Sequence, residues 1–195
     1  MDIATLRHPS EIASDRSARR SIATYSRIME LWDSGCDPTS GEFRRLFVGF
    51  YRVRRTSDWC DGFFSLMRPL GGRKWLGIRE VLDAIDSACG GDGRVELSFA
   101  SKLLHTVNPC MPIWDSLVRA RTALPGVPTS GCYADRASAA EALYGRLCAQ
   151  FNDALSDGAV KTLLREMETA IPECSRMTDV KKLDFLMWLS RDVTP

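Results

Sequence analysis

The sequence predicts an all-α protein, a compact multi-helix domain of eight or nine helices. Apolar residues recur at the three- and four-residue spacing of a helix through most of the 195 residues. No segment alternates polar and apolar residues as a half-buried strand does, and β-branched residues do not cluster. We expect a polar N-terminal arm over residues 1–15 and one domain, built in one or two lobes, over residues 16–195.

Most of the expected helices up to residue 124 are bounded by residues that start or stop helices. The first ends before Gly35, and Ser40 caps the second. A Gly-Gly-Asp-Gly turn at 90–93 follows the fourth helix, Pro109 lies just beyond the end of the fifth, and Asp115 opens the sixth. The expected helices are 16–32, 40–51, 59–67, 75–88, 95–107, 115–124, 136–155, 158–171 and 178–191.

The composition is that of an ordinary globular protein, with 45% hydrophobic and 26% charged residues. The net charge of +1 argues neither for nor against a nucleic-acid partner. Basic residues are densest in the segment 42–55, where Glu42 is the one acidic residue. This segment is either an electrostatic footprint for phosphates or a solvated helix face. Its basic residues are Arg44, Arg45, Arg52, Arg54 and Arg55.

The seven cysteines are odd in number and widely spaced, and no CxxC motif occurs. This pattern argues against a disulfide framework, a zinc ribbon and a cysteine-bound iron–sulfur cluster. The chain has only one histidine besides His105, so we expect neither a metal nor a cofactor. No apolar run approaches the roughly 18–20 residues of a membrane span, and the N-terminus has no apolar signal core. We expect a cytoplasmic protein with reduced thiols and no membrane association. The sequence does not define its oligomeric state.

The glycine-rich turn at 90–93 has two interpretations. Gly91 and Gly93 can adopt positive φ angles and allow a phosphate oxygen to approach the backbone. The N-terminus of the following helix offers unpaired N–H groups, and Arg94 adds a positive charge. Alternatively, the glycines only close one helix and open the next.

Asp115 also has two compatible interpretations. Aspartate is among the best N-cap residues, and Asp115 lies where a helix begins after a proline-containing loop. The other interpretation is a catalytic carboxylate that stabilises developing positive charge or activates water.

The order of these parts resembles the helix-hairpin-helix DNA glycosylase superfamily of the 8-oxoguanine glycosylase and endonuclease III type. The resemblance covers residues 75–122: a helix, the glycine hairpin, a second helix, the loop 109–114 and then Asp115. It implies that the hairpin binds DNA phosphate and that Asp115 is the catalytic aspartate. Bifunctional members carry a lysine nucleophile where this chain has Val95, so the resemblance implies a monofunctional enzyme. Lys102, two turns further on, reaches such a site only in a different hairpin register.

Four residues are candidates for the wall of a base pocket, each with a structural alternative. Lys102 is otherwise a surface residue or a phosphate contact. His105 otherwise braces the core or the proline loop, and Trp114 and Trp188 otherwise pack in the core. The leading hypothesis is a DNA-binding protein of glycosylase type that uses Asp115. The alternatives are a non-catalytic nucleic-acid-binding module with the same fold, and an interaction or regulatory helical protein.

Overall fold

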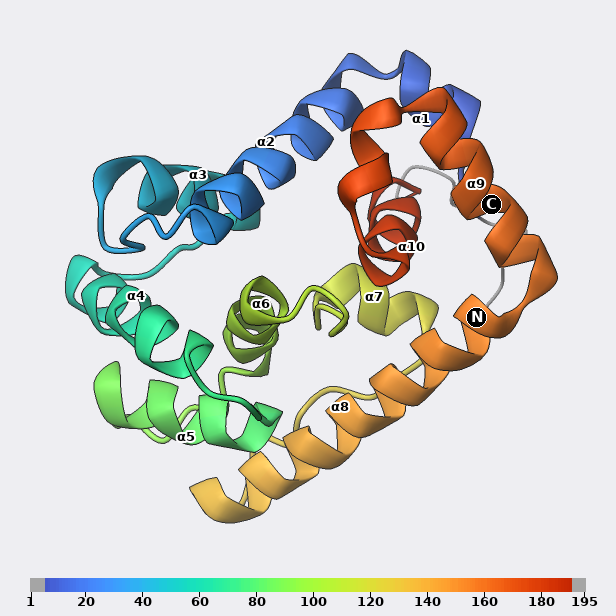
Figure 1. Cartoon of the computed structure of the whole chain (residues 1–195). Coiled ribbons are helices and arrows are strands. Elements are labelled where there is room, and N and C mark those ends of the chain that lie inside the picture. Colours follow the sequence, from blue (N-terminus) through green and yellow to red (C-terminus); the bar gives the residue numbers. More distant parts are fainter. Residues whose placement is uncertain (1–5, 191–195) are drawn as a thin grey trace.

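Helices account for all the regular secondary structure of residues 6–190, the part of the chain described by a computed structural model (Figure 1). The all-α prediction is therefore confirmed. The described elements are α1 (Pro9–Ser14), α2 (Arg16–Asp33), α3 (Gly41–Tyr51), α4 (Ser57–Gly71), α5 (Ile78–Ala88), α6 (Leu97–Val107), α7 (Ser116–Arg121), α8 (Tyr133–Ser156), α9 (Gly158–Ala170), the 3₁₀ helix η2 (Pro172–Arg176) and α10 (Asp179–Leu189).

Helix α1 lies in the segment for which the sequence indicated only a polar arm. His8 caps it, since the side-chain Nδ1 accepts a hydrogen bond from the backbone N–H of Ser10 at 3.3 Å. Ile12 is fully buried, because α1 packs against α9 and α2. One large apolar residue in a short helix is too little for a periodicity signal, so this helix was missed. The last expected helix was placed as far as residue 191, which lies outside the described residues.

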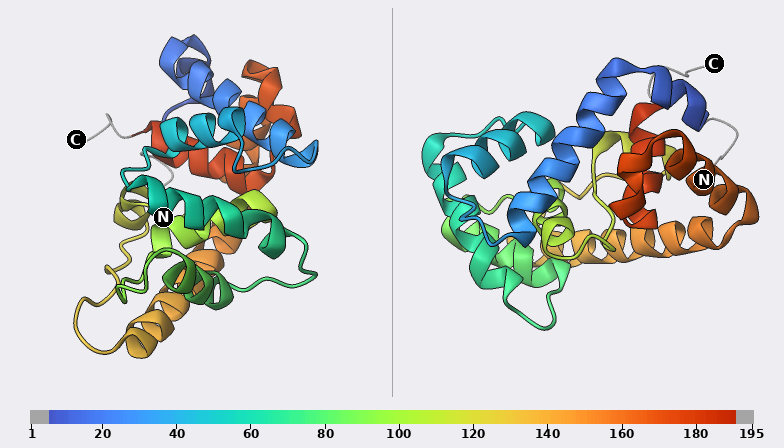
Figure 2. Two further views of the ribbon diagram at one scale, coloured as in Figure 1. Left: turned by 90° about the vertical axis from the view of Figure 1, so that its left-hand side faces the viewer. Right: turned by 45° about the horizontal axis from the view of Figure 1, so that its top comes forward.

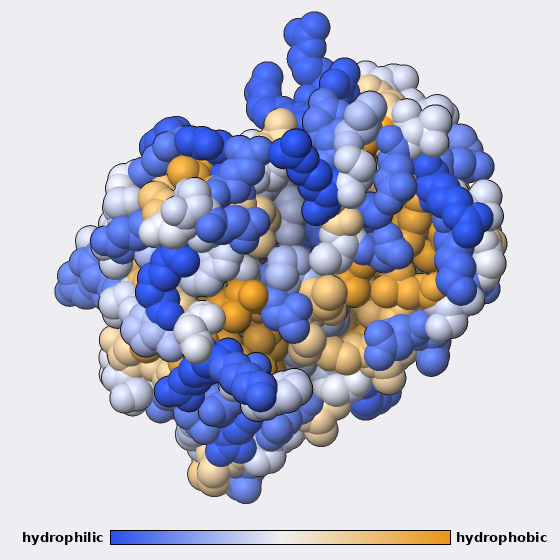
Figure 3. All heavy atoms as spheres, viewed as in Figure 1, coloured by the Kyte–Doolittle hydropathy of each residue, from blue (hydrophilic) through white to orange (hydrophobic). Residues whose placement is uncertain are grey.

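The helices form two groups joined by two long helices. Figure 1 shows α3 to α6 on one side of the molecule and α1, α9 and α10 on the other. Helices α2 and α8 run between the two groups along opposite edges, an arrangement that the turned views in Figure 2 also show. Polar side chains cover most of the face seen in Figure 3, and apolar side chains appear where that face is hollowed.

Aromatic side chains hold the first group of helices together. Phe47 of α3 lies 5.4 Å, between ring centroids, from Phe64 of α4, in an edge-on arrangement, and both rings are fully buried. Phe43 and Phe63 extend this cluster and are also fully buried. Aromatic pairs of this kind add about 0.5–1.5 kcal/mol beyond the area that they bury, so α3 and α4 have a fixed relative position.

The α5–α6 connection is a glycine hairpin, as the sequence predicts. Gly90, Gly91 and Gly93 have positive φ angles of 121°, 56° and 69°. The N–H of Gly91 donates a hydrogen bond of 2.8 Å to the carbonyl of Asp86, which closes the end of α5. Helix α6 begins at Leu97 rather than at residue 95, so the connection is longer than expected.

Among the described residues, no helix is both long and apolar enough to cross a membrane. All seven cysteines lie within the described part of the chain and are free thiols.

Candidate functional site

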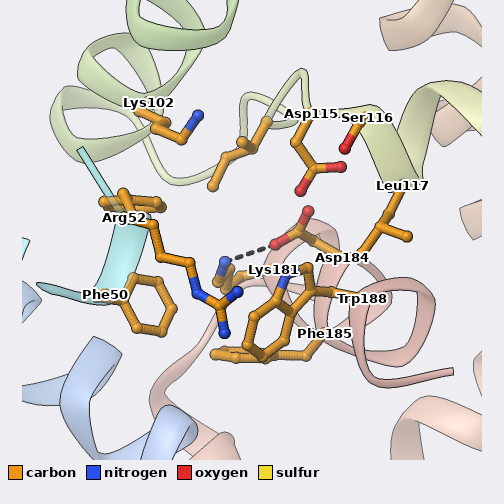
Figure 4. Close-up of a pocket in the computed structure, with 12 residues that line it drawn as sticks. Phe50, Arg52, Lys102, Asp115, Ser116, Leu117, Lys181, Asp184, Phe185 and Trp188 are labelled. Carbon is orange, nitrogen blue, oxygen red and sulfur yellow. Dashed lines mark hydrogen bonds and ion pairs between the residues drawn. The ribbon is translucent and has the colours of Figure 1, made fainter. Parts of the chain in front are cut away.

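A pocket of about 230 Å³ opens where α3 ends, between the start of α7 and α10 (Figure 4). Its wall combines aromatic rings with five charged side chains from four separate segments. The aromatic residues are Phe50, Tyr51, Phe185 and Trp188, and the charged residues are Arg52, Lys102, Asp115, Lys181 and Asp184. Charged groups within an aromatic wall are typical of binding and catalytic sites.

Asp115 lines this pocket and also caps α7, so both interpretations of the residue apply to its position. Its Oδ1 accepts a hydrogen bond of 2.7 Å from the N–H of Val118. The preceding loop is held at two points. The N–H of Trp114 donates to Ser101 Oγ at 2.9 Å, and the Tyr144 hydroxyl donates to the carbonyl of Pro112 at 2.8 Å. These bonds fix the direction in which the Asp115 side chain leaves the backbone.

Lys102 lies in the pocket wall and is only 7% exposed, so its interpretation as a surface residue is wrong. Helix α6 is buried along most of its length, and the Lys102 side chain lines the pocket. Its Nζ donates to the Ser98 carbonyl at 3.1 Å and to Ser98 Oγ at 2.5 Å. Burial lowers the pKa of Lys102 to about 8, against the opposing effect of Asp115 and Asp184.

His105 is fully buried and does not line the pocket. Its Nδ1 lies 2.7 Å from the Met111 carbonyl, which can only accept, so Nδ1 carries the proton. Its Nε2 therefore accepts a hydrogen bond of 2.9 Å from the Tyr25 hydroxyl. Burial, with a contribution from the charge of Lys181, lowers the pKa of His105 to about 3, so the ring is neutral. His105 therefore braces the proline loop, as one of its two interpretations expects.

The two tryptophan candidates lie in different environments. Trp114 is 7% exposed, packs in the core and does not contribute to the pocket wall. Trp188 lines the pocket, with its ring centroid 6.4 Å from that of Phe50. Of the two, only Trp188 is placed to contact a ligand in the pocket.

The hairpin residues lie away from this pocket. Gly91, Gly93 and Arg94 do not line it, and Arg94 forms an exposed ion pair with Asp92 at 3.2 Å. A guanidinium from another helix reaches the hairpin, because Arg136 Nη2 donates to the Gly93 carbonyl at 2.7 Å. The positive charges at the hairpin are thus partly engaged within the protein.

The basic segment does not form one patch. Arg44 pairs with Asp61, and Arg55 pairs with Glu96 while lying over the Trp59 and Phe99 rings. The remaining arginines, Arg45, Arg52 and Arg54, face two different hollows, and Arg55 also lines one of these. Arg54 and Arg55 line an open hollow of about 780 Å³ with Gly90 and Asp92 of the hairpin.

Arg45 and Arg52 meet Arg20, from α2, around a second hollow of about 450 Å³. This hollow shares Phe50, Arg52 and Trp188 with the pocket, so the two lie side by side. Within the described residues, no carboxylate lines this second hollow, and no ion pair is formed by Arg20 or Arg52. The hollow is therefore a basic rim at the edge of the pocket, and Arg20 was not foreseen as part of it.

Lys181 and Asp184 are the functional candidates that the sequence analysis missed. Their helix was expected over residues 178–191, but neither residue was singled out as a candidate, and in α10 both charged side chains are nearly fully buried. A signal was present. Lys181, Asp184 and Trp188 stand three and four residues apart, which places two charged residues and a tryptophan along one stripe of a helix.

In the described part of the chain, no three side chains of histidine, cysteine, aspartate or glutamate are grouped so that they could hold a metal ion. The chain matches no protein-family model, no curated protein sequence and no solved structure.

Proposed function

We propose that the chain is a DNA-binding protein of the DNA glycosylase type, in which a base rotated out of the duplex enters the pocket beside Asp115. The observation that carries the proposal is the dual position of Asp115. One carboxylate oxygen caps α7, and the side chain also lines an aromatic pocket. The hairpin and the loop before Asp115 support it further, because they follow the order of parts in the glycosylases.

The chemistry needs a negative charge beside the sugar. As the N-glycosidic bond breaks, the base leaves with the bonding electrons and positive charge develops on the sugar ring. The Asp115 carboxylate stabilises that charge, and the N-terminus of α7 stabilises the carboxylate. A water molecule then adds to the sugar carbon and gives its proton to Asp115.

The size and lining of the pocket suit one heterocycle. Its volume of about 230 Å³ is below the roughly 300–1,000 Å³ of sites for drug-sized ligands. Phe50 and Trp188 offer ring faces or edges to a base, which is how enzymes of this type hold an extruded nucleotide. The basic rim formed by Arg20, Arg45 and Arg52 supplies positive charge for the phosphates on either side of that nucleotide.

Lys102 provides a second way to complete the reaction. A pKa of about 8 leaves a useful fraction of neutral amine near neutral pH, and the neutral amine is the nucleophile. The neutral Lys102 amine attacks the sugar carbon, and the base leaves with the bonding electrons. The nitrogen then loses a proton and the bond from this carbon to the ring oxygen breaks, which opens the sugar and gives a covalent imine that borohydride reduces. Trapping of the protein on DNA by borohydride, lost in Lys102→Met, distinguishes this route from attack by water.

A non-catalytic DNA-binding module is the second candidate. The observation that favours it is Val95, which packs against the core where bifunctional glycosylases carry their lysine. Such a module binds duplex DNA with a strong salt dependence and releases no base.

The test is base release from duplexes that carry oxidised, alkylated, deaminated or mismatched bases. Asp115→Asn is the informative variant, because asparagine caps a helix as well as aspartate does but carries no charge. Asp157→Asn is its control, since Asp157 caps α9 in the same way, with Oδ1 2.7 Å from the Ala159 N–H, and does not line the pocket.

We expect base release by the wild type and by Asp157→Asn, with a loss of at least about 100-fold in Asp115→Asn. Salt-sensitive duplex binding without base release from any substrate supports the non-catalytic module instead. Full activity in Asp115→Asn, or no duplex binding at low salt, refutes the glycosylase proposal.

A further inference from the structure

A buried ion pair in the pocket has no evident structural purpose. Lys181 Nζ donates a hydrogen bond of 2.5 Å to Asp184 Oδ2, and the two side chains are 2% and 6% exposed. The ammonium group also lies 4.6 Å from the Tyr25 ring centroid and 4.4 Å from that of Phe185. Replacing such a pair with apolar residues of similar volume is often neutral or stabilising. A pair of this kind is therefore weak evidence for a structural role.

One oxygen of this pair is unsatisfied. Asp184 Oδ1 is buried and has no hydrogen-bond partner among the described residues. A buried acceptor without a partner costs about 1–3 kcal/mol, and more when it carries charge. The other buried side-chain atoms in this condition belong to Asp86, Tyr133 and Gln150, none of which lines the pocket. Asp184 is thus the place where an unsatisfied buried acceptor coincides with a cavity.

Asp184 faces a second carboxylate. Figure 4 shows the side chains of Asp115 and Asp184 pointing toward one another across the pocket, one from the start of α7 and the other from α10. Burial raises the pKa of Asp184 against the opposing effect of Lys181, and the charge of Asp115 contributes a smaller rise. A group with two hydrogen-bond donors placed between the carboxylates relieves both the repulsion and the unsatisfied oxygen.

The charges in the pocket favour a neutral donor over a cation. Arg52, Lys102 and Lys181 supply three positive charges, against two negative charges from Asp115 and Asp184. An added cation increases an existing excess of positive charge. An amino group on an aromatic ring is neutral, has two N–H donors in the plane of the ring, and leaves the ring itself to contact Phe50 and Trp188.

We propose that Asp115 and Asp184 together bind the exocyclic amino group of a nucleobase, so that the pocket selects amino-bearing bases over their deaminated counterparts. Asp184 Oδ1 accepts one N–H and the Asp115 carboxylate accepts the other. A base with a carbonyl at that position places a third acceptor against two carboxylates and is rejected. The inference takes from the proposed function only the class of ligand, and it concerns the complex with a free base, in which Asp115 contacts the amino group and not a sugar.

The test measures the binding of free nucleobases to the whole protein by NMR titration. Three matched pairs differ by an amino group replaced with a carbonyl: adenine and hypoxanthine, cytosine and uracil, guanine and xanthine. We expect the amino-bearing member of each pair to bind at least about tenfold more tightly, since a hydrogen bond to a charged group is worth that much or more. Equal binding within the pairs, a preference for the carbonyl members, or no saturable binding of any base overturns the proposal.

Asp184→Asn assigns the preference to this residue. The amide introduced by this substitution replaces the negative acceptor with a group that can donate to a carbonyl, so the preference is expected to disappear or to reverse. A preference that persists in this variant overturns the role given to Asp184. Because Asp184→Asn leaves Lys181 without its partner, the double variant Lys181→Met, Asp184→Asn serves as a second form and is expected to lose the preference as well.

These outcomes are separate from those of the base-release assay. If the protein discriminates the free bases but releases none from DNA, the amino-group site is supported and the glycosylase proposal is refuted. If the protein releases bases and the presence of an amino group makes no difference, only the proposed amino-group site is refuted.

Discussion

The Tyr25 hydroxyl donates a hydrogen bond of 2.9 Å to Nε2 of His105, linking α2 to the central helix α6. The other ring nitrogen of His105 holds the Met111 carbonyl, in the loop that leads to Asp115. One neutral imidazole therefore connects the long edge helix to the segment that presents the candidate catalytic carboxylate. The linkage depends on the imidazole staying neutral, because protonation gives Nε2 a hydrogen and ends its role as acceptor.

The first prediction concerns acid stability. The pKa of His105 is about 3 in the folded protein and 6.5 in the unfolded chain, so the unfolded state binds more protons between these values. This stabilisation is fully present above pH 6.5 and is lost progressively as the pH falls toward 3. In His105→Gln the amide can make both hydrogen bonds but cannot titrate.

The free energy of unfolding, measured by urea titration from about pH 7 to about pH 4, should therefore fall more steeply for the wild type than for His105→Gln. The extra loss is expected to be a few kcal/mol, on the order of 1.4 kcal/mol per pH unit below the unfolded pKa. Parallel pH profiles for the two proteins contradict the assignment.

The second prediction concerns two glycines inside helices. A Cβ on Gly62 of α4 would collide with the backbone carbonyl oxygen of Ala88, at the end of α5 beside the hairpin. Gly145 of α8 has open space at the same position. Gly62→Ala should lower the free energy of unfolding by about 1–3 kcal/mol or more, because backbone must move to admit the methyl group. Gly145→Ala should raise it by about 0.5–1 kcal/mol, which is the ordinary helix preference for alanine. Thermal or urea unfolding of both variants measures the contrast, and equal effects would show that α4 and α5 do not approach so closely.

The third prediction concerns the stability cost of Lys102. Burial lowers its pKa from 10.5 to about 8, so folding disfavours the charged form. This penalty is fully present below pH 8 and disappears as the pH rises from 8 to 10.5. Lys102→Met keeps most of the packing and removes the charge, so it should raise the free energy of unfolding at about pH 7 by roughly 1–3 kcal/mol. The gain should shrink as the pH rises toward 10.5. A variant less stable than the wild type at neutral pH argues that the Ser98 hydrogen bonds outweigh the burial of the charge.

The sequence was sufficient for the helices because each buries a regular apolar stripe and most end at residues with a local signal. The glycine hairpin and the cap at Asp115 are local features, and both were predicted. Helix α1 was missed because it has too few apolar residues, and α6 was started too early because nothing in the sequence defines the length of the hairpin.

The pocket was only partly predictable, because tertiary packing brings its residues together. Asp115, Lys102 and Trp188 were candidates from the sequence, and all three line it. His105 and Trp114 were candidates for the same pocket. Their positions, in α6 and in the loop before α7, place both side chains in the core instead. No pattern along the chain indicates that the end of α3 meets α10, so Asp184 and the basic rim required the structure.

The last prediction concerns Arg52, which stands at the C-terminal end of α3 in a left-handed conformation with φ of 50° and ψ of 48°. Glycine adopts this conformation without strain, whereas a residue with a Cβ costs about 1 kcal/mol there. Ala123, after α7, has a similar φ of 51° but does not line the pocket. Both Arg52→Gly and Ala123→Gly should therefore raise the free energy of unfolding, by up to about 1 kcal/mol.

If the basic rim binds DNA phosphates, only Arg52→Gly should also weaken duplex binding and reduce its salt dependence by about one released counterion. Equal duplex binding by the two variants, measured by fluorescence anisotropy across a salt series, removes Arg52 from the DNA contact. A loss of stability in Arg52→Gly would instead mean that the arginine side chain, lying among Phe50, Lys181 and Trp188 in Figure 4, stabilises the fold by more than its backbone strain costs.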